Sequence, residues 1–135
     1  MGQKVNPIGL RVGISKTWNS KWYAGKDYPE QLKQDLSIQK FVKKRLKHAA
    51  ISHIEVERTA KKTKVNIFTA RPGIIIGRKG DEVERLKHEL NKLTRHEVIV
   101  NIKEIKRPEI EATLVAENIA NQLERRIAYR RAIRR

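Results

Sequence analysis

Two glycines spaced three residues apart are the part of this sequence best suited to contact with a phosphate backbone. The segment reads Gly77-Arg78-Lys79-Gly80. Glycines permit a sharp turn and carry no side chain that would keep a polynucleotide at a distance. Backbone N–H groups and the N-terminus of a following helix can then face phosphate, while Arg78 and Lys79 add positive charge. The segment therefore predicts a loop that holds a short run of nucleotides.

This spacing alone is a weak signal, because an ordinary turn between two helices also uses glycine. Its context favours nucleic acid, since apolar residues 74–76 precede the loop and an amphipathic helix and a strand follow it. Other phosphate loops do not fit, because a Walker loop starting at Gly73 would need glycine where Arg78 stands. Asp81 and Glu82 count against tight phosphate contact, because they compete for the same helix dipole.

The net charge also indicates a polyanionic partner. Lys and Arg total 31 against 15 Asp and Glu, which gives +16 over 135 residues. So much like charge repels itself in a compact chain, and phosphate contacts relieve it by releasing counterions. Nucleic acid is the first candidate partner, and an anionic membrane is the second.

The sequence offers little support for membrane insertion or enzymatic chemistry. No apolar run approaches the ~20 residues of a membrane span, and no signal peptide is visible, so we expect a cytoplasmic protein with no membrane partner. The chain has no cysteine, and its four histidines lack metal-site spacing. We find no nucleophile motif and no marked carboxylate pair. We therefore expect no catalytic residue, no metal and no cofactor.

Residues 1–27 are expected to form an extended basic arm, because glycines, a proline and polar residues interrupt any long helix. Trp18, Trp22 and Tyr23 alternate with its basic residues. Such rings can stack on bases while lysines follow the phosphates. They can also pin the arm to the folded core, and we favour this role for at least one tryptophan. The candidate RNA-binding residues of the arm are Lys4, Arg11, Lys16 and Lys21.

Residues 28–106 show alternating helix and strand patterns. Pro29 suits the first turn of a helix. The predicted buried face of this helix holds Leu32, Leu36, Val42 and Leu46, and Ile38 and Phe41 widen that face. Alternation of apolar and polar residues predicts three strands, of which the first two pair antiparallel. The expected elements after the first helix are strands at 53–59 and 64–67, a buried apolar turn at 74–76, a helix at 83–93 and a strand at 97–105. This order predicts an α+β fold, with helices on one face of a three-stranded sheet.

Residues 107–135 are expected to form one long basic helix after Pro108. Glutamates dominate its early part and six arginines its end, an order that suits the helix dipole on a solvated face. Six arginines exceed what the dipole needs, and arginine suits forked contacts with phosphate.

Four blocks of sequence closely resemble the bacterial-type family of small-subunit ribosomal protein three. They are residues 2–11, 69–80, 122–126 and 129–132, read as GQKVNPIGLR, TARPGIIIGRKG, QLERR and YRRA. The resemblance implies a type II KH domain in the head of the small ribosomal subunit, beside the messenger entry channel of cytoplasmic ribosomes. It implies contacts with small-subunit ribosomal RNA, with messenger RNA and with neighbouring ribosomal proteins of the head. It also matches Arg130, Arg131 and Arg134 to basic positions that the family presents to messenger RNA.

The sequence departs from the family in two places. Thr59 stands where the family often has proline. The family also carries a second α/β domain after the last helix, so residues 107–135 are expected to begin that domain.

The leading interpretation is a structural ribosomal protein, which is not an enzyme. The alternatives are a free-standing KH regulator or RNA chaperone, and an RNA-modifying or strand-separating enzyme.

Overall fold

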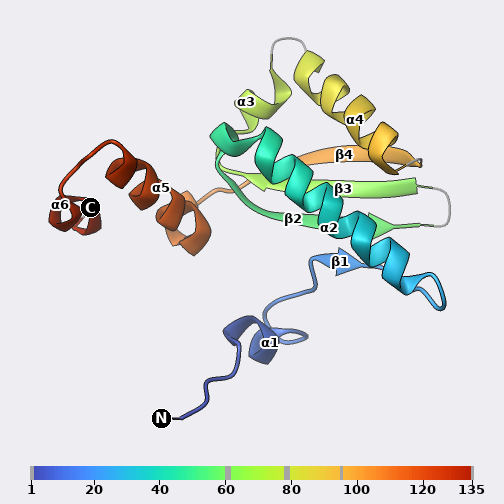
Figure 1. Ribbon diagram of the computed structural model, residues 1–135, viewed down its shortest axis with the longest axis horizontal. Helices are drawn as coiled ribbons and strands as arrows, with labels where there is room; N and C mark the ends of the chain where they lie inside the picture. Colours follow the sequence, from blue (N-terminus) through green and yellow to red (C-terminus); the bar gives the residue numbers. More distant parts are fainter. Residues whose placement is uncertain (1, 60–61, 78–79, 95, 135) are drawn as a thin grey trace.

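The computed structural model describes residues 2–59, 62–77, 80–94 and 96–134, and its centre is a four-stranded sheet (Figure 1). The strands lie in the order β1-β2-β3-β4. Strand β2 pairs antiparallel with β3, whereas β1–β2 and β3–β4 are parallel. Their bounds are Ser20–Lys21 for β1, Ile51–Arg58 for β2, Lys62–Thr69 for β3 and Glu97–Glu104 for β4. The three expected strands and their antiparallel first pair are confirmed, and the arm adds the fourth, two-residue strand.

Two long helices cover one face of this sheet, as the sequence predicted (Figure 1). They are α2 at Tyr28–Arg45 and α4 at Asp81–Thr94. The core joins side chains of both helices to alternate residues of the strands, while β2 and β3 also bury residues such as Glu55 and Asn66 on their other face. Its fully buried members include Ile38, Val42, Val65, Ile67, Leu90 and Val98.

The predicted inner face of α2 was partly wrong. Leu36 is 56% exposed, whereas Ile38 and Val42 are fully buried. The sequence contains two overlapping apolar rows on this helix, and periodicity alone does not decide which row meets the sheet. The sheet takes the row that contains Ile38 and Val42, and the short helix η1 at Lys47–Ala49 then leads into β2.

The N-terminal arm is attached to the core through the buried carboxylate of Asp35 on α2. This side chain is 1% exposed and forms an ion pair with Arg58 of β2. Ser20 Oγ and Trp22 Nε1 of the arm both donate hydrogen bonds to it, at 3.0 and 2.6 Å. The Trp22 ring also packs against Tyr28, with centroids 5.4 Å apart. The expectation that at least one tryptophan pins the arm to the core is therefore confirmed.

The expected single helix after Pro108 is wrong. The chain forms the short helix η3 at Pro108–Ile110, then α5 at Ala112–Glu124 and α6 at Tyr129–Ile133. Arg126 ends α5 with a left-handed φ of 61°. Its N–H bonds to the carbonyl of Leu123, and the next N–H bonds to that of Gln122, which closes the helix end. Glycine usually fills this position, so the sequence carried no stop signal.

No helix in the described part of the chain is both long and apolar enough to cross a membrane.

We predict that Asp35→Ala destabilises the protein strongly. The change leaves the largely buried Arg58 guanidinium without its partner, so the free energy of unfolding should fall by roughly 3–5 kcal/mol. Urea denaturation measures this loss. As a control, Glu97→Gln breaks the exposed pair with Lys62 and should cost less than about 1 kcal/mol. Equal effects of the two substitutions would contradict the role of the buried carboxylate.

Candidate nucleic-acid interface

The glycine loop follows the short helix α3, which spans Pro72–Ile76, and leads into α4 (Figure 1). Gly77 closes α3 by donating its N–H to the carbonyl of Gly73 at 3.0 Å. Its backbone has φ 67° and ψ −170°, a combination that essentially only glycine adopts. A Cβ atom at this position would lie 2.8 Å from Cγ of Glu82. Conformation and space both require glycine here.

Gly80 ends the loop in a different environment. Its φ is +86°, but a Cβ atom there would meet nothing within 4 Å. The loop backbone at Gly80 is therefore open to approach from outside, which is the property that a phosphate contact needs. Arg78 and Lys79, the predicted basic residues of the loop, lie outside the described residues.

The start of α4 carries three carboxylates, Asp81, Glu82 and Glu84. They complement the positive end of the helix dipole, which reduces its attraction for an external anion. The Glu82 carboxylate lies 3.8 Å from a guanidinium nitrogen of Arg85, so part of its charge is offset within the helix. The helix dipole therefore offers little attraction for an external phosphate at this loop, as the sequence had suggested.

Two isoleucines next to the loop are exposed. The apolar turn was expected to be buried, but only Ile75 is, whereas Ile74 and Ile76 are 48% and 44% exposed. A five-residue helix lying at the edge of the core can bury one side chain and must present the others outward. The exposed pair provides an apolar surface beside a polar loop, a combination suited to bases next to their phosphates.

The basic residues of the arm differ in whether they form an ion pair within the protein. Lys4, Arg11 and Lys16 are exposed. Lys21 in contrast forms an ion pair with Glu55 at 3.1 Å, so its charge is partly engaged within the protein. Helix α1, Pro7–Arg11, is capped by Asn6 and buries none of its residues.

Two aromatic residues of the arm are exposed, and a third contacts the folded core. Trp18 is 68% exposed and Tyr23 is 97% exposed, so both rings are open to stacking. Trp22 instead belongs to the cluster around Asp35.

The arginines of the C-terminal candidate site lie on and next to α6. Arg130, Arg131 and Arg134 are all exposed. Arg130 donates to the hydroxyl of Tyr129 at 3.0 Å, and its guanidinium lies 5.7 Å from that ring, which orients it. Figure 1 shows that α1 of the arm, the ends of α3 and α4 that flank the glycine loop, and α6 lie in three separate parts of the molecule. The fold does not bring the three predicted sets together into one site.

A cluster of His53, Phe68 and Lys103 on the other face of the sheet was not predicted from the sequence, which showed only that the four histidines lack metal-site spacing. The His53 ring stacks on Phe68 with centroids 4.1 Å apart, and the Lys103 ammonium lies 5.0 Å from the Phe68 ring. Burial lowers the pKa of His53 below its ordinary value, although the nearby carboxylates of Glu111 and Glu55 act to raise it. The three side chains are neighbours only because the strands are in register, which sequence spacing does not reveal.

The described residues contain no group of three or more side chains that could hold a metal ion.

The fold and the glycine loop agree with those of a known protein family. The model of the KH domain family matches residues 37–110, which include the glycine loop and the strands on either side of it. The chain belongs to the KH domain family. The order of helices and strands is that of the type II KH fold, which confirms the fold class expected from the sequence.

Relatives of this KH protein match it along its whole length. It is 64% identical to small ribosomal subunit protein uS3 of Geobacter sp. (strain M21). It is 62% identical to the protein of the same name from Syntrophus aciditrophicus and 58% identical to that from Geobacter sulfurreducens. All 135 residues are covered, and the chain spans 62–64% of the length of these relatives. The resemblance inferred from the four sequence blocks is confirmed.

We predict that Gly77→Ala destabilises the KH domain more than Gly80→Ala. Both positions have positive φ, but only at Gly77 does the new methyl group press on Glu82. The Gly77 substitution should cost about 1–3 kcal/mol, measured by urea denaturation. Adding Glu82→Ala should recover part of that loss, because it removes the Cγ atom in the way. An equal cost at both glycines, with no recovery, would mean that the loop has a different shape.

Proposed function

We propose that this protein is a structural component of the small ribosomal subunit. It binds ribosomal RNA in the head and helps to position messenger RNA at the entry channel, without catalysing a reaction. The observation that carries the proposal is identity of 58–64% over the whole chain to proteins named small ribosomal subunit protein uS3. Its place of action would be the cytoplasmic ribosome, beside neighbouring proteins of the head.

The charge distribution supports this role. The chain has a net charge of +16, and its candidate RNA-binding residues come from three separate segments, which suits an embedded protein that contacts RNA on several sides. A protein that reads one short RNA would need one basic surface instead. Each lysine or arginine that meets a phosphate releases counterions, so several distant contacts add to the affinity.

The glycine loop, the basic residues of the arm and the arginines on and next to α6 form three basic sets, and each has a different role in this proposal. The glycine loop accepts the backbone of unpaired RNA, with bases against Ile74 and Ile76. Lys4, Arg11 and Lys16 of the arm meet ribosomal RNA, and Lys21 joins them only if it leaves Glu55. Arginines 130, 131 and 134 face messenger RNA.

We predict that reversing the two loop charges weakens RNA binding without unfolding the protein. The variant Arg78→Asp with Lys79→Asp leaves both glycines in place. Affinity for an unstructured single-stranded RNA should fall, and the slope of log affinity against log salt should become shallower by ~0.7 for each lost contact. Fluorescence anisotropy at several salt concentrations measures both quantities.

The matched control for the loop variant is Lys87→Glu with Lys92→Glu. These lysines are exposed on α4, so the control changes the net charge by the same amount away from the loop. If the control weakens binding as much as the loop variant does, the loop has no special role.

We also predict that Arg130→Ala, Arg131→Ala and Arg134→Ala together impair messenger contacts more than assembly. The triple variant should sediment with small subunits after a high-salt wash, because the arm and the loop remain. Crosslinking of these subunits to a messenger that reaches the entry channel should decrease. Loss of the variant from the particles would assign these arginines to ribosomal RNA. A normal protein that washes off under the same conditions would indicate a free-standing regulator.

A further inference from the structure

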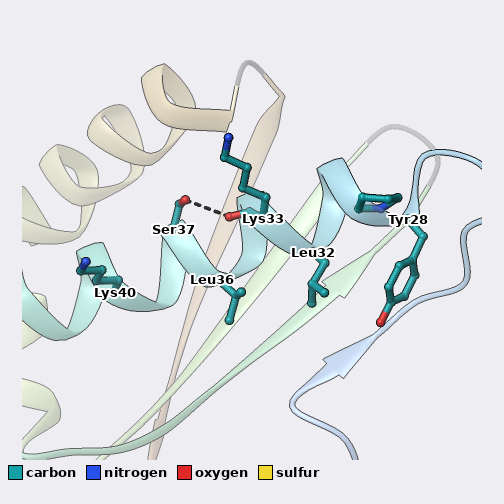
Figure 2. Close-up of a pocket in the computed structure, with 7 residues that line it drawn as sticks. Tyr28, Leu32, Lys33, Leu36, Ser37 and Lys40 are labelled. Atoms are coloured by element: carbon teal, nitrogen blue, oxygen red, sulfur yellow. Dashed lines mark hydrogen bonds between the residues drawn. The ribbon is translucent and has the colours of Figure 1, made fainter.

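An apolar groove lies on the surface of α2 that faces away from the sheet (Figure 2). Its volume is about 460 Å³. Figure 2 shows Tyr28, Leu32 and Leu36 projecting from the same side of the helix. Tyr28 is 50% exposed and Leu36 is 56% exposed. The other residues that line the groove are Pro29, Lys33, Ser37 and Lys40.

Only Tyr28, at one end of this groove, takes part in a contact described above, where its ring packs against Trp22. Other residues of α2 supply the contacts within the protein, since Ile38 and Val42 belong to the core and Asp35 to the cluster that holds the arm. Scattered exposed leucines are common, but a row of apolar residues on one helical face is a surface suited to a partner. The positions 28, 32, 36 and 40 form the i±4 ridge by which helices most often pack on other helices.

The charges around the groove select the kind of partner. Lys33 and Lys40 line it, and none of its lining residues carries a carboxylate. A helix that brings apolar side chains to Leu32 and Leu36 therefore gains from acidic residues beside them.

RNA fits this surface less well than protein. Aliphatic leucines offer no flat face for base stacking, and the Tyr28 ring already packs against Trp22. The Ser37 hydroxyl donates to the carbonyl of Lys33 at 2.8 Å, so its proton is not free to read a base edge (Figure 2). The groove thus offers apolar contact and two positive charges, with few groups that could select a nucleotide.

We propose that this groove, lined by Tyr28, Leu32, Leu36, Lys33 and Lys40, binds an amphipathic helix with acidic flanks from a neighbouring protein of the small subunit. The inference rests on the proposed function, because it takes the partner from the same particle. It adds an interaction surface on α2 that is separate from the three basic sets.

Photo-crosslinking from inside the groove tests the proposal. Cells produce the full protein with p-benzoylphenylalanine in place of Leu36, and their small subunits are isolated by sedimentation and irradiated. We expect an adduct that protease removes and nuclease does not, and mass spectrometry should locate it in an acidic helix of another protein. Lys33→Glu with Lys40→Glu should lower the adduct yield by at least about tenfold, because like charges then meet. The control Lys87→Glu with Lys92→Glu should leave the yield unchanged.

The outcomes separate this proposal from the one it rests on. A variant protein that enters small subunits but gives a nuclease-sensitive adduct, an adduct with a second copy of itself, or no adduct would overturn the groove assignment alone. A normal protein that never sediments with small subunits would overturn the proposed function and this inference together.

Discussion

The parallel pairing of β3 and β4 is the constraint on which the loop and its surroundings depend. A chain that leaves β3 at one end of the sheet must return to the other end before it can enter β4. Helix α4 makes this return, since its 14 residues span ~21 Å against ~26 Å for the eight-residue strand. The chain must therefore turn sharply between α3 and α4, and Gly77 makes that turn in a conformation open to little else. The requirement for glycine at position 77 is a consequence of this topology.

Charged side chains are paired with each other in the interior of the protein, whereas those of the arm are exposed to solvent. Asp35 and Arg58 neutralise each other in the interior, and the remaining acceptor capacity of the carboxylate holds Ser20 and Trp22. The arm is thereby fixed at its inner end, while Lys4 and Arg11 lie in solvent further along it. One buried carboxylate thus fixes the base of a cationic segment, and the cost of burying its charge is met by four donor groups.

Local patterns predicted most of the elements, because the rules behind them act over a few residues. Alternation at Val98, Val100 and Ile102 marked β4, and Pro29 marked the start of α2. The predicted face of α2 was too wide, because packing against the sheet buries Ile38 but leaves Leu36 exposed, and periodicity does not determine this. Helix α5 ends where Arg126 adopts a left-handed backbone conformation. Because this residue is not glycine, its type did not predict the end of the helix.

The candidate site was predictable to the same extent. The glycines, the arm and the arginines could be found from sequence, because residue type carries their chemistry. Their separation into three parts of the molecule could not, since it follows from the tertiary fold. The Asp35 cluster and the stack of His53 on Phe68 join residues distant in sequence through strand register and helix docking, so neither produced a local signal.

The central claim is that RNA approaches the main chain at the glycine loop of this KH domain. Ultraviolet crosslinking of the purified protein to an unstructured single-stranded RNA, mapped by mass spectrometry, tests it most directly. The account predicts crosslinked peptides from the segment between α3 and α4, with further ones from the arm. Crosslinks confined to the arm and α6, with none between α3 and α4, would contradict it.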